Sequence, residues 1–404
     1  MPSLSAPFRI ATIYVATFLT FGIYIPFFPV FLAGRGLDAT AIAVIVAAPM
    51  ALRVATVSFL GTIVDRSTDR RRVLVVYNGI ALLAFLLVWP ANSPLAMLLA
   101  MLATALFWNA VNPTNDAIAS VIARREKRDY GRMRVWGSIS FVVANVVGGA
   151  VLARTSPEAV YWMMLGGFVL QFAAAFLAPH LPPAADAPVT REPFSAGLKL
   201  LGGDWRFVGM LLGASMMQGA HALLYGFSSL HWRAQGYSGD AVGLLWALGV
   251  AGEVTLFFLG RPLTGPLGAR GLLVFGGLAG VIRWSASPLA ESLPFWSGLQ
   301  LLHAFSFAAT HLGVMQGIAT TAPERHAATA QGLYLAISGL VMTLATLASG
   351  PLYQRFGGGG FLGMAVLAAV GTGVVLAAME PTVRGGRTLQ PQRLGGGGSN
   401  VEPS

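Results

Sequence analysis

The sequence predicts an all-α membrane protein with twelve transmembrane helices arranged as two six-helix halves. The first observation is composition: 55% of the 404 residues are hydrophobic and 10% are charged, whereas soluble domains carry about 25% charged residues. The second is that the hydrophobic residues form runs of the roughly 20 residues that cross a hydrocarbon core of about 30 Å. The third is one long polar connector that divides these runs six and six.

Twelve apolar runs set the expected spans, of which the third is short and the tenth is long. In the first half they cover residues 10–32, 40–64, 73–90, 95–118, 135–153 and 159–177. In the second half they cover residues 207–230, 241–259, 271–289, 293–320, 328–352 and 358–379. The run from Ile10 is long enough to span and lacks a small-residue cleavage site, so we expect a helix there rather than a signal peptide.

This pattern divides the chain into four segments. Residues 1–177 are the expected N-terminal half, 178–206 a proline-rich cytoplasmic connector, and 207–379 the C-terminal half. Residues 380–404 are rich in Gly and Arg, and residues 395–399 are typical of a flexible linker, so we expect a disordered tail.

Basic residues predict the orientation of the chain. With the N-terminus in the cytoplasm, 19 of the 26 Lys and Arg residues fall on cytoplasmic segments and four fall outside, which is the asymmetry of the positive-inside rule. We expect a multi-pass protein of a cell inner membrane with both termini cytoplasmic. The net charge of +10 lies in short clusters between apolar runs, so it does not indicate nucleic-acid binding.

Several function classes lack their sequence signals. The chain has no cysteine, which excludes a disulfide framework and a thiolate metal site. We find no His-Glu-x-x-His cluster of a metalloenzyme and no Gly-x-x-x-x-Gly-Lys-Ser/Thr loop of an ATP-driven pump. A receptor would more commonly carry an added soluble domain. We therefore expect no enzyme activity, no cofactor and no metal, and a monomer whose partners are a small solute, protons and the lipid bilayer.

The two halves resemble each other in sequence. Tyr24 and Gly36 are echoed by Tyr225 and Gly236, at an offset of about 200 residues. A second match pairs residues 148–154 with residues 349–355. Two matches at nearly the same offset suggest duplication of a six-helix unit. A duplicated unit of this kind places a transport site near the membrane midplane between the halves, where rocking alternates access.

The expected loop between the second and third spans carries Gly61, Asp65 and Arg66 before a basic run. It resembles the major facilitator superfamily signature Gly-x-x-x-Asp-Arg-x-Gly-Arg-Arg, with Thr68 replacing the second glycine and the basic run shifted by one. The resemblance implies the major facilitator fold and a gating role for this loop. Gly61 would permit close helix approach, and Asp65 could cap a helix N-terminus or pair with an arginine across the half interface.

Ionisable side chains in the expected spans usually mark a transport pathway. They are Arg53, Asp116, Arg134, His221, Glu253, Arg283, His303 and His311. Because unpaired burial of a charge is prohibitive, we expect arginine–carboxylate pairs among them.

The region from Pro113 through residue 138 resembles the helix 4–5 region of the lactose permease family. That resemblance implies a charge pair of Asp116 and Arg134 at the substrate site. It also implies a coupling role for three further residues, Glu253, Arg283 and His303. Ser306 and Gln300 stand where that family has a proton-carrying glutamate and a lysine, and Gln218 and His221 stand opposite its helix 7 aspartates. The proton route of that family therefore does not carry over.

A second resemblance covers most of the chain. Residues 22–28, 129–138, 218–229, 236–246 and 282–284 resemble the 3-phenylpropionate transporter group of the same superfamily. This resemblance implies proton-driven uptake of an aromatic carboxylate, although specificity transfers poorly within one fold.

The residue chemistry is compatible with such a substrate. A carboxylate requires a cation in a dry cavity, and arginine supplies a two-pronged donor. Arg53 is the leading candidate, since we can assign it no acidic partner in its own helix. The predicted substrate-binding residues are Arg53, Asp116, Arg134, Tyr24, Phe141, His221 and Tyr225. The predicted coupling residues are Glu253, Arg283 and His303, and the predicted gating residues are Gly61, Asp65 and Arg66. A proton symporter for a sugar or nucleoside, or a drug exporter, of the same fold is the alternative.

Overall fold

The computed structural model describes residues 5–180, 198–199, 202–260 and 265–380. Every regular element within these ranges is helical, which confirms the predicted all-α fold. Nine helical stretches there are long and apolar enough to cross a membrane. The twelve expected spans reduce to these nine because α15 and α16 are counted as one stretch, α6 is shorter, and the tenth run is interrupted. Most of the expected connector and tail lies outside the described residues.

The first six spans are single helices. They are α1 (Ala6–Gly34), α2 (Ala39–Arg66), α3 (Arg70–Phe85), α4 (Pro94–Arg125), α5 (Tyr130–Arg154) and α6 (Ala159–Ala175). A short 3₁₀ helix, Leu86–Val88, extends α3. Helix α3 begins three residues before the expected third span, 73–90.

The second half contains more elements for the same number of expected spans. They are α8 (Trp205–Gly219), α9 (Ala222–Ala234), α10 (Gly239–Leu259), α12 (Gly268–Ala286), α13 (Leu293–Leu301), α14 (Thr310–Thr321), α15 (Ala327–Phe356) and α16 (Phe361–Ala378). The seventh run forms one apolar stretch, Trp205–Ala234, as expected, but neither it nor the tenth run is a continuous α-helix. A turn at Ala220 and His221 separates α8 from α9, and a π-helix, Ala304–Ala309, joins α13 to α14.

Polar side chains at the helix starts explain where many of these elements begin. Asp38, Asp129 and Ser238 accept hydrogen bonds from backbone N–H groups in the first turns of α2, α5 and α10. These donors have no partner within the helix. The caps satisfy these donors at the exposed ends of the helices and so fix where each helix begins.

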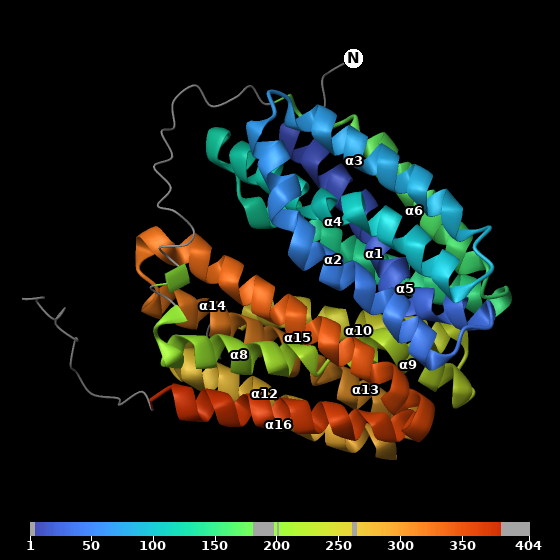
Figure 1. Cartoon of the computed structure of the whole chain (residues 1–404), viewed down its shortest axis with the longest axis vertical. Coiled ribbons are helices and arrows are strands. Elements are labelled where there is room, and N and C mark those ends of the chain that lie inside the picture. The colour runs from blue at the N-terminus through green and yellow to red at the C-terminus, as the bar shows by residue number, and fades with distance from the viewer. Residues whose placement is uncertain (1–4, 181–197, 200–201, 261–264, 381–404) are drawn as a thin grey trace, which may run out of the picture.

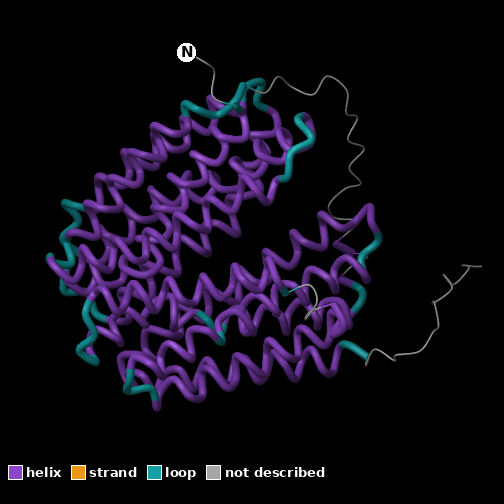
Figure 2. The backbone as a smooth tube through the Cα atoms, turned by 180° about the vertical axis from the view of Figure 1, so that it is seen from behind, coloured by secondary structure: helices purple, strands orange, loops and turns teal. Residues whose placement is uncertain are grey.

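The helices form two groups that meet at one end and diverge at the other (Figures 1 and 2). Helices α1–α6 pack on one another, as do α8–α16, and the main contacts between the groups are α2 with α15 and α5 with α10. The groups diverge towards the end that carries the chain's N-terminus. We call this the N-terminal end of the bundle, and we call the other the sealed end.

Small residues make the contact at the sealed end close. A Cβ atom added at Gly149 of α5 would lie 2.5 Å from the carbonyl oxygen of Gly239 and 2.9 Å from Cα of Gly243, both on α10. A Cβ atom added at Gly350 of α15 would lie 2.6 Å from Cβ of Ala43 on α2. Only residues without a larger side chain allow backbones to approach this closely in membrane helices.

The two halves share details that support the inferred duplication. Gly36 and Gly236 both follow a helix with a left-handed φ, +82° and +89°. Beside them, the Arg35 guanidinium donates to the carbonyl of Ala91 at 3.3 Å, and the Gln235 amide donates to the carbonyl of Ala290 at 2.9 Å. Equivalent positions thus make equivalent contacts in the two halves.

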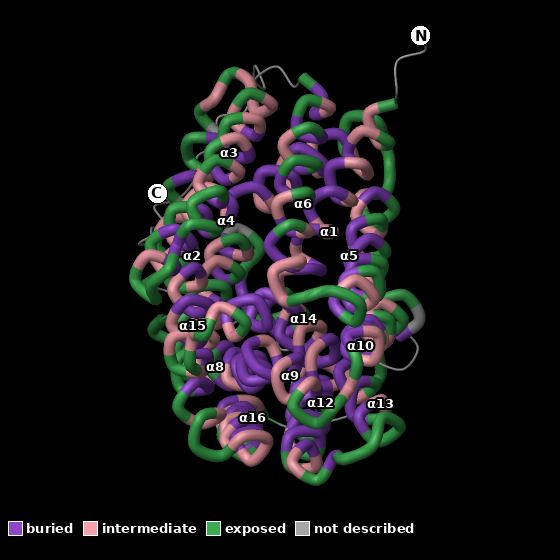
Figure 3. The backbone as a smooth tube through the Cα atoms, turned by 90° about the vertical axis from the view of Figure 1, so that its right-hand side faces the viewer, coloured by how far each residue is buried: buried purple, intermediate pink, exposed green. Residues whose placement is uncertain are grey.

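Large apolar side chains remain exposed over the outer surface, as a lipid-facing surface requires. In α16 the buried residues recur every three or four positions, and in Figure 3 this helix shows exposed segments beside buried ones. Leu83, Leu95 and Phe258 are each exposed by about 65%. Lipid chains would cover these side chains in place of protein.

Candidate substrate and proton site

A cavity of about 490 Å³ lies between the two helix groups. Helices α1 and α2 supply one wall, and α9 and α15 supply the other. Most of its lining is apolar, including Ile25, Val46 and Leu335. Such a mainly apolar cavity with few polar groups is the usual form of a small-molecule site.

Arg53 is the charged residue among those that line this cavity. It lies in the middle of α2, and its side chain is exposed to the cavity. Within the described part of the chain it makes no hydrogen bond or ion pair, and Asp116 acts on it only as a more distant charge. A guanidinium has five N–H donors, so Arg53 offers a set of donors to a bound anion.

Aromatic rings share the lining of this cavity with Arg53. Tyr24 and Phe28 come from α1, with ring centroids 5.2 Å apart, and Tyr225 comes from α9. Tyr24 is held edge-on against Trp108, with centroids 5.1 Å apart. These rings provide flat apolar surface of the kind that packs favourably against another aromatic ring.

A second cavity of about 270 Å³ shares Ile25 and Tyr225 with the first. Its lining is more polar and includes Arg134 from the first half and Glu253 from the second half. The other sequence-predicted residues in its lining are Phe141 and His303. The two cavities thus adjoin at Ile25 and Tyr225, with Arg53 in the lining of the first and titratable groups in the lining of the second.

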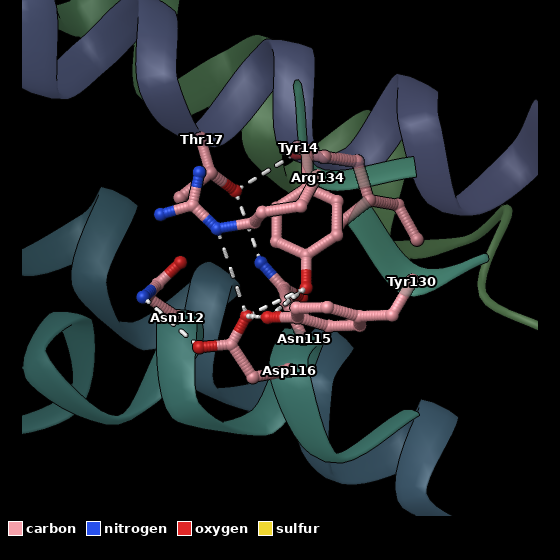
Figure 4. A network of polar contacts seen from close by, with 8 residues as sticks. Tyr14, Thr17, Asn112, Asn115, Asp116, Tyr130 and Arg134 are labelled. Atoms are coloured by element: carbon pink, nitrogen blue, oxygen red, sulfur yellow. Dashed lines mark hydrogen bonds and ion pairs between the residues drawn. The ribbon is translucent and has the colours of Figure 1, made fainter. Parts of the chain in front are cut away.

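Asp116 is held mainly by two phenols, as Figure 4 shows. The hydroxyls of Tyr14 and Tyr130 donate to its Oδ1 at 2.6 Å and 2.8 Å. The expected ion pair with Arg134 is present but longer, with Nε to Oδ1 at 3.9 Å. The Arg134 guanidinium also lies 4.0 Å from the ring centroid of Phe18, a favourable cation–π contact. Asp116 itself does not appear in the lining of either cavity.

Arg283 of α12 is buried with neutral partners, so the expected pairing with a carboxylate is wrong for this residue. Its Nη1 lies 2.9 Å from Nδ1 of His303, and it also donates to the Ser306 hydroxyl at 3.3 Å. Its Nη2 donates to the amide oxygen of Gln300. Its guanidinium also lies 4.3 Å from the ring centroid of Trp284. Only 1% of Arg283 is exposed.

Glu253 and His303 come together as the coupling prediction requires. Oε2 of Glu253 on α10 lies 3.6 Å from Nε2 of His303. His303 is therefore the bridge between the carboxylate and Arg283.

His221 lies behind the cavity wall rather than in it. It is fully buried at the turn between α8 and α9, and neither cavity lining contains it. The sequence-based expectation of direct substrate contact is not supported by this position. Its ring faces the Ser306 hydroxyl at 3.2 Å instead.

The expected gating loop differs from its prediction in two details. No described atom lies within 4 Å of a Cβ atom added at Gly61, because the helix groups diverge at this end, so close helix approach is wrong for this conformation. Asp65 belongs to the last turn of α2, and its side chain lies outside the described part of the structure; Arg66 follows it and is exposed. The N-cap of α3 is Asp69, which accepts from the N–H of Arg71 at 3.0 Å.

Sequence reasoning missed the roles of five residues in these clusters. They are Tyr14, Tyr130, Phe28, Gln300 and Ser306. Tyr130 lies inside a stretch that carried both family resemblances, which could have indicated it. Phe28 lies inside another stretch that carried a resemblance, and Gln300 and Ser306 stand at positions that a resemblance had already marked. The contact of Tyr14 with Asp116 joins residues 102 positions apart and leaves no local pattern.

Comparison with known proteins places this chain in a family. A family model described as the MFS_1 like family matches residues 8–361. The chain belongs to this family of the major facilitator superfamily. It is a transporter rather than an enzyme, and it therefore handles a small solute across a membrane.

Relatives of this transporter agree with that assignment, and solved structures of other proteins share its fold. A probable 3-phenylpropionic acid transporter of Escherichia coli (strain K12) is 32% identical over 362 residues, covering 88% of this chain and 93% of the relative. A maltose permease of Geobacillus stearothermophilus is 25% identical, covering 90% and 92%. The crystal structure of the nucleoside transporter NupG superposes with a TM-score of 0.80 at 15% identity, covering 93% and 99% of the two chains. The last similarity shows the fold alone.

Proposed function

We propose that this transporter is a proton-coupled symporter that imports an aromatic carboxylate such as 3-phenylpropionate. The observation that carries the proposal is the position of Arg53. Its guanidinium has no protein partner among the described residues, and it lines a cavity together with Tyr24, Phe28 and Tyr225. A carboxylate would satisfy its donors in a two-pronged arrangement. The aromatic ring of the same solute would pack among the three side chains.

Proton coupling would use the second cavity. Glu253 lines it, sits 3.6 Å from His303, and faces Arg134 across the two helix groups. A carboxylate in this position can take up a proton when the cavity opens to one side and release it when the cavity opens to the other. The similarity to the named E. coli transporter supports the substrate class.

The direction of access follows from the predicted orientation. We propose that the N-terminal end of the bundle is cytoplasmic, in a cell inner membrane, so that this conformation opens inward. Residues 1–177 and 207–379 would then move as two halves of a monomer, with the segment of Gly61, Asp65 and Arg66 closing the cytoplasmic side.

The test of the substrate class is uptake into proteoliposomes by wild-type, Arg53→Ala and Arg53→Lys transporters. Radiolabelled 3-phenylpropionate and a neutral solute, maltose or a nucleoside, would be compared with and without an imposed pH gradient. We expect wild-type accumulation of the acid to follow the gradient, Arg53→Ala to abolish it, and Arg53→Lys to retain part of it, because lysine keeps the charge but not the fork. Acid uptake that survives Arg53→Ala, or wild-type uptake of the neutral solute alone, would contradict the assignment.

A further inference from the structure

At the turn between α8 and α9, the His221 side chain bonds backbone carbonyls in addition to the backbone's own hydrogen bonds. The backbone N–H of His221 bonds the carbonyl of Gln218, three residues before it. The carbonyl of Met217, which would accept that N–H in a continuous helix, instead lies 3.2 Å from Nδ1 of the His221 ring. The carbonyl of Gln218 is 3.1 Å from the same nitrogen. Because a carbonyl only accepts, Nδ1 of His221 carries the ring hydrogen.

This assignment fixes the direction of the next bond. With its hydrogen on Nδ1, neutral His221 has an acceptor at Nε2, and the Ser306 hydroxyl lies 3.2 Å from it. Ser306 therefore donates to His221. Its oxygen remains available as the acceptor for Nη1 of Arg283 at 3.3 Å. Ser306 occupies this position in the π-helix Ala304–Ala309, an irregularity that occurs often at functional sites.

Arg283 then determines the hydrogen position on His303. A guanidinium only donates, and its Nη1 lies 2.9 Å from Nδ1 of His303. That nitrogen must be the unprotonated one. In a neutral ring the hydrogen is consequently on Nε2, which is the nitrogen that faces Glu253 at 3.6 Å.

We propose that His221 and Ser306 are positioning residues of the proton-coupling site. They hold Arg283 against His303, and Arg283 in turn keeps the Nε2 hydrogen of His303 directed at the Glu253 carboxylate. Neither residue touches the substrate: both are buried outside the linings of the two cavities. The break in the seventh span and the π-helix in the tenth are the features that bring them together. This inference rests on the proposed proton coupling through Glu253.

The charged and titratable groups around this cluster come from several elements. Glu253 lies on α10 and Arg283 on α12, and His303 directly precedes the π-helix. Arg134 of α5 lines the same cavity as Glu253, His311 of α14 is a further titratable group near Glu253, and the ring centroid of Tyr225 on α9 lies 6.1 Å from that of His221. His221 and Ser306 reach Glu253 only through Arg283 and His303.

The first experiment separates coupling from substrate movement in proteoliposomes. Substrate exchange at equal pH needs no net proton transfer, whereas accumulation against a gradient does. We expect Ser306→Ala and His221→Leu to keep exchange and substrate affinity. We expect both to lower gradient-driven accumulation. For Ser306→Ala the fall should be about tenfold or more, since losing a buried hydrogen bond to a charged donor is worth at least a factor of ten. His221→Gln should retain part of it, because its amide oxygen can accept from Ser306.

A matched control is available on α8. Ser215 is also a fully buried serine, and its hydroxyl has no hydrogen-bond partner in the described structure. Ser215→Ala should leave accumulation unchanged. Wild-type-like accumulation by Ser306→Ala would overturn the proposal, and so would a loss of exchange that equals the loss of accumulation. If the wild type exchanges substrate but ignores the pH gradient, the proposed coupling itself is refuted, and this role is refuted with it.

The second experiment reads the hydrogen position directly. Imidazole ¹⁵N resonances distinguish the two neutral forms of histidine, and His303→Gln identifies the signal among the six histidines of the chain. We expect the Nε2–H form for His303 in the wild type and a mixture of both forms in Ser306→Ala, with Ser215→Ala matching the wild type. A wild-type His303 with its hydrogen on Nδ1 would overturn the positioning role whatever the transport result.

Discussion

The contact at the sealed end should control which side of the membrane the cavity faces. Gly149→Ala would place a Cβ atom 2.5 Å from the Gly239 carbonyl oxygen, 2.9 Å from Cα of Gly243 and 3.0 Å from its backbone nitrogen. Ordinary carbon contacts lie at about 3.5–4.0 Å, so α5 and α10 must separate by about 1 Å. All three neighbours are backbone atoms of one helix and cannot rotate away.

The magnitude follows from the cost of overpacking. An extra methyl group in a closely packed contact costs about 1–3 kcal/mol. This cost applies only while the sealed end is closed, whereas the helix-forming gain of alanine over glycine is common to both conformations. The equilibrium should therefore shift towards opening at that end by about 5–150-fold.

Thiol labelling measures this shift because the chain has no native cysteine. Ile25 lines both cavities, so Ile25→Cys provides a single reporter, and a membrane-impermeant maleimide is added to the side opposite the N-terminus. Gly149→Ala should increase labelling from that side. Gly166→Ala is the matched control, since a Cβ atom there meets nothing described within 4 Å. Equal labelling of Gly149→Ala and the control, in proteins of equal thermal stability, would refute the reasoning.

Three further outcomes are expected. Glu253→Gln should retain substrate exchange and lose pH-driven accumulation, and accumulation at the wild-type level would exclude Glu253 as the proton carrier. Tyr14→Phe removes the 2.6 Å hydrogen bond to Asp116 and should lower the free energy of unfolding by about 1.5 kcal/mol. This is the lower end of the range for hydrogen bonds to a charged acceptor, because Tyr130 still donates to Asp116. An unchanged thermal midpoint would contradict this. Asp240→Asn breaks a 3.1 Å ion pair with Arg154, in which the Asp240 side chain is 44% exposed and the Arg154 side chain 67% exposed. Because the pair is exposed, the substitution should change the free energy of unfolding by less than about 1 kcal/mol. A larger fall in thermal stability would show that this pair holds the sealed end together.

Part of the candidate site could be predicted from the sequence because charge within an apolar run is conspicuous. Arg53 and Glu253 were indicated in this way, and both line cavities in the structure. The same reasoning placed Arg283 opposite a carboxylate, since burial of an unpaired cation is costly. The structure gives it His303, Ser306 and Gln300 instead. Neutral acceptors leave no signal in a hydropathy pattern, so only their spatial convergence reveals them.

The sequence by itself determined the all-α membrane fold, because the length and hydropathy of a span depend only on local residues and on the thickness of the bilayer. The tertiary structure decided where that regularity fails. At the turn in the seventh span, the His221 ring bonds carbonyls that a continuous helix would use, and its other partner, Ser306, is 85 residues away. Asp69 rather than Asp65 caps α3, because α2 continues through Arg66. Such choices depend on which groups meet in space, which the order of residues along one helix does not specify.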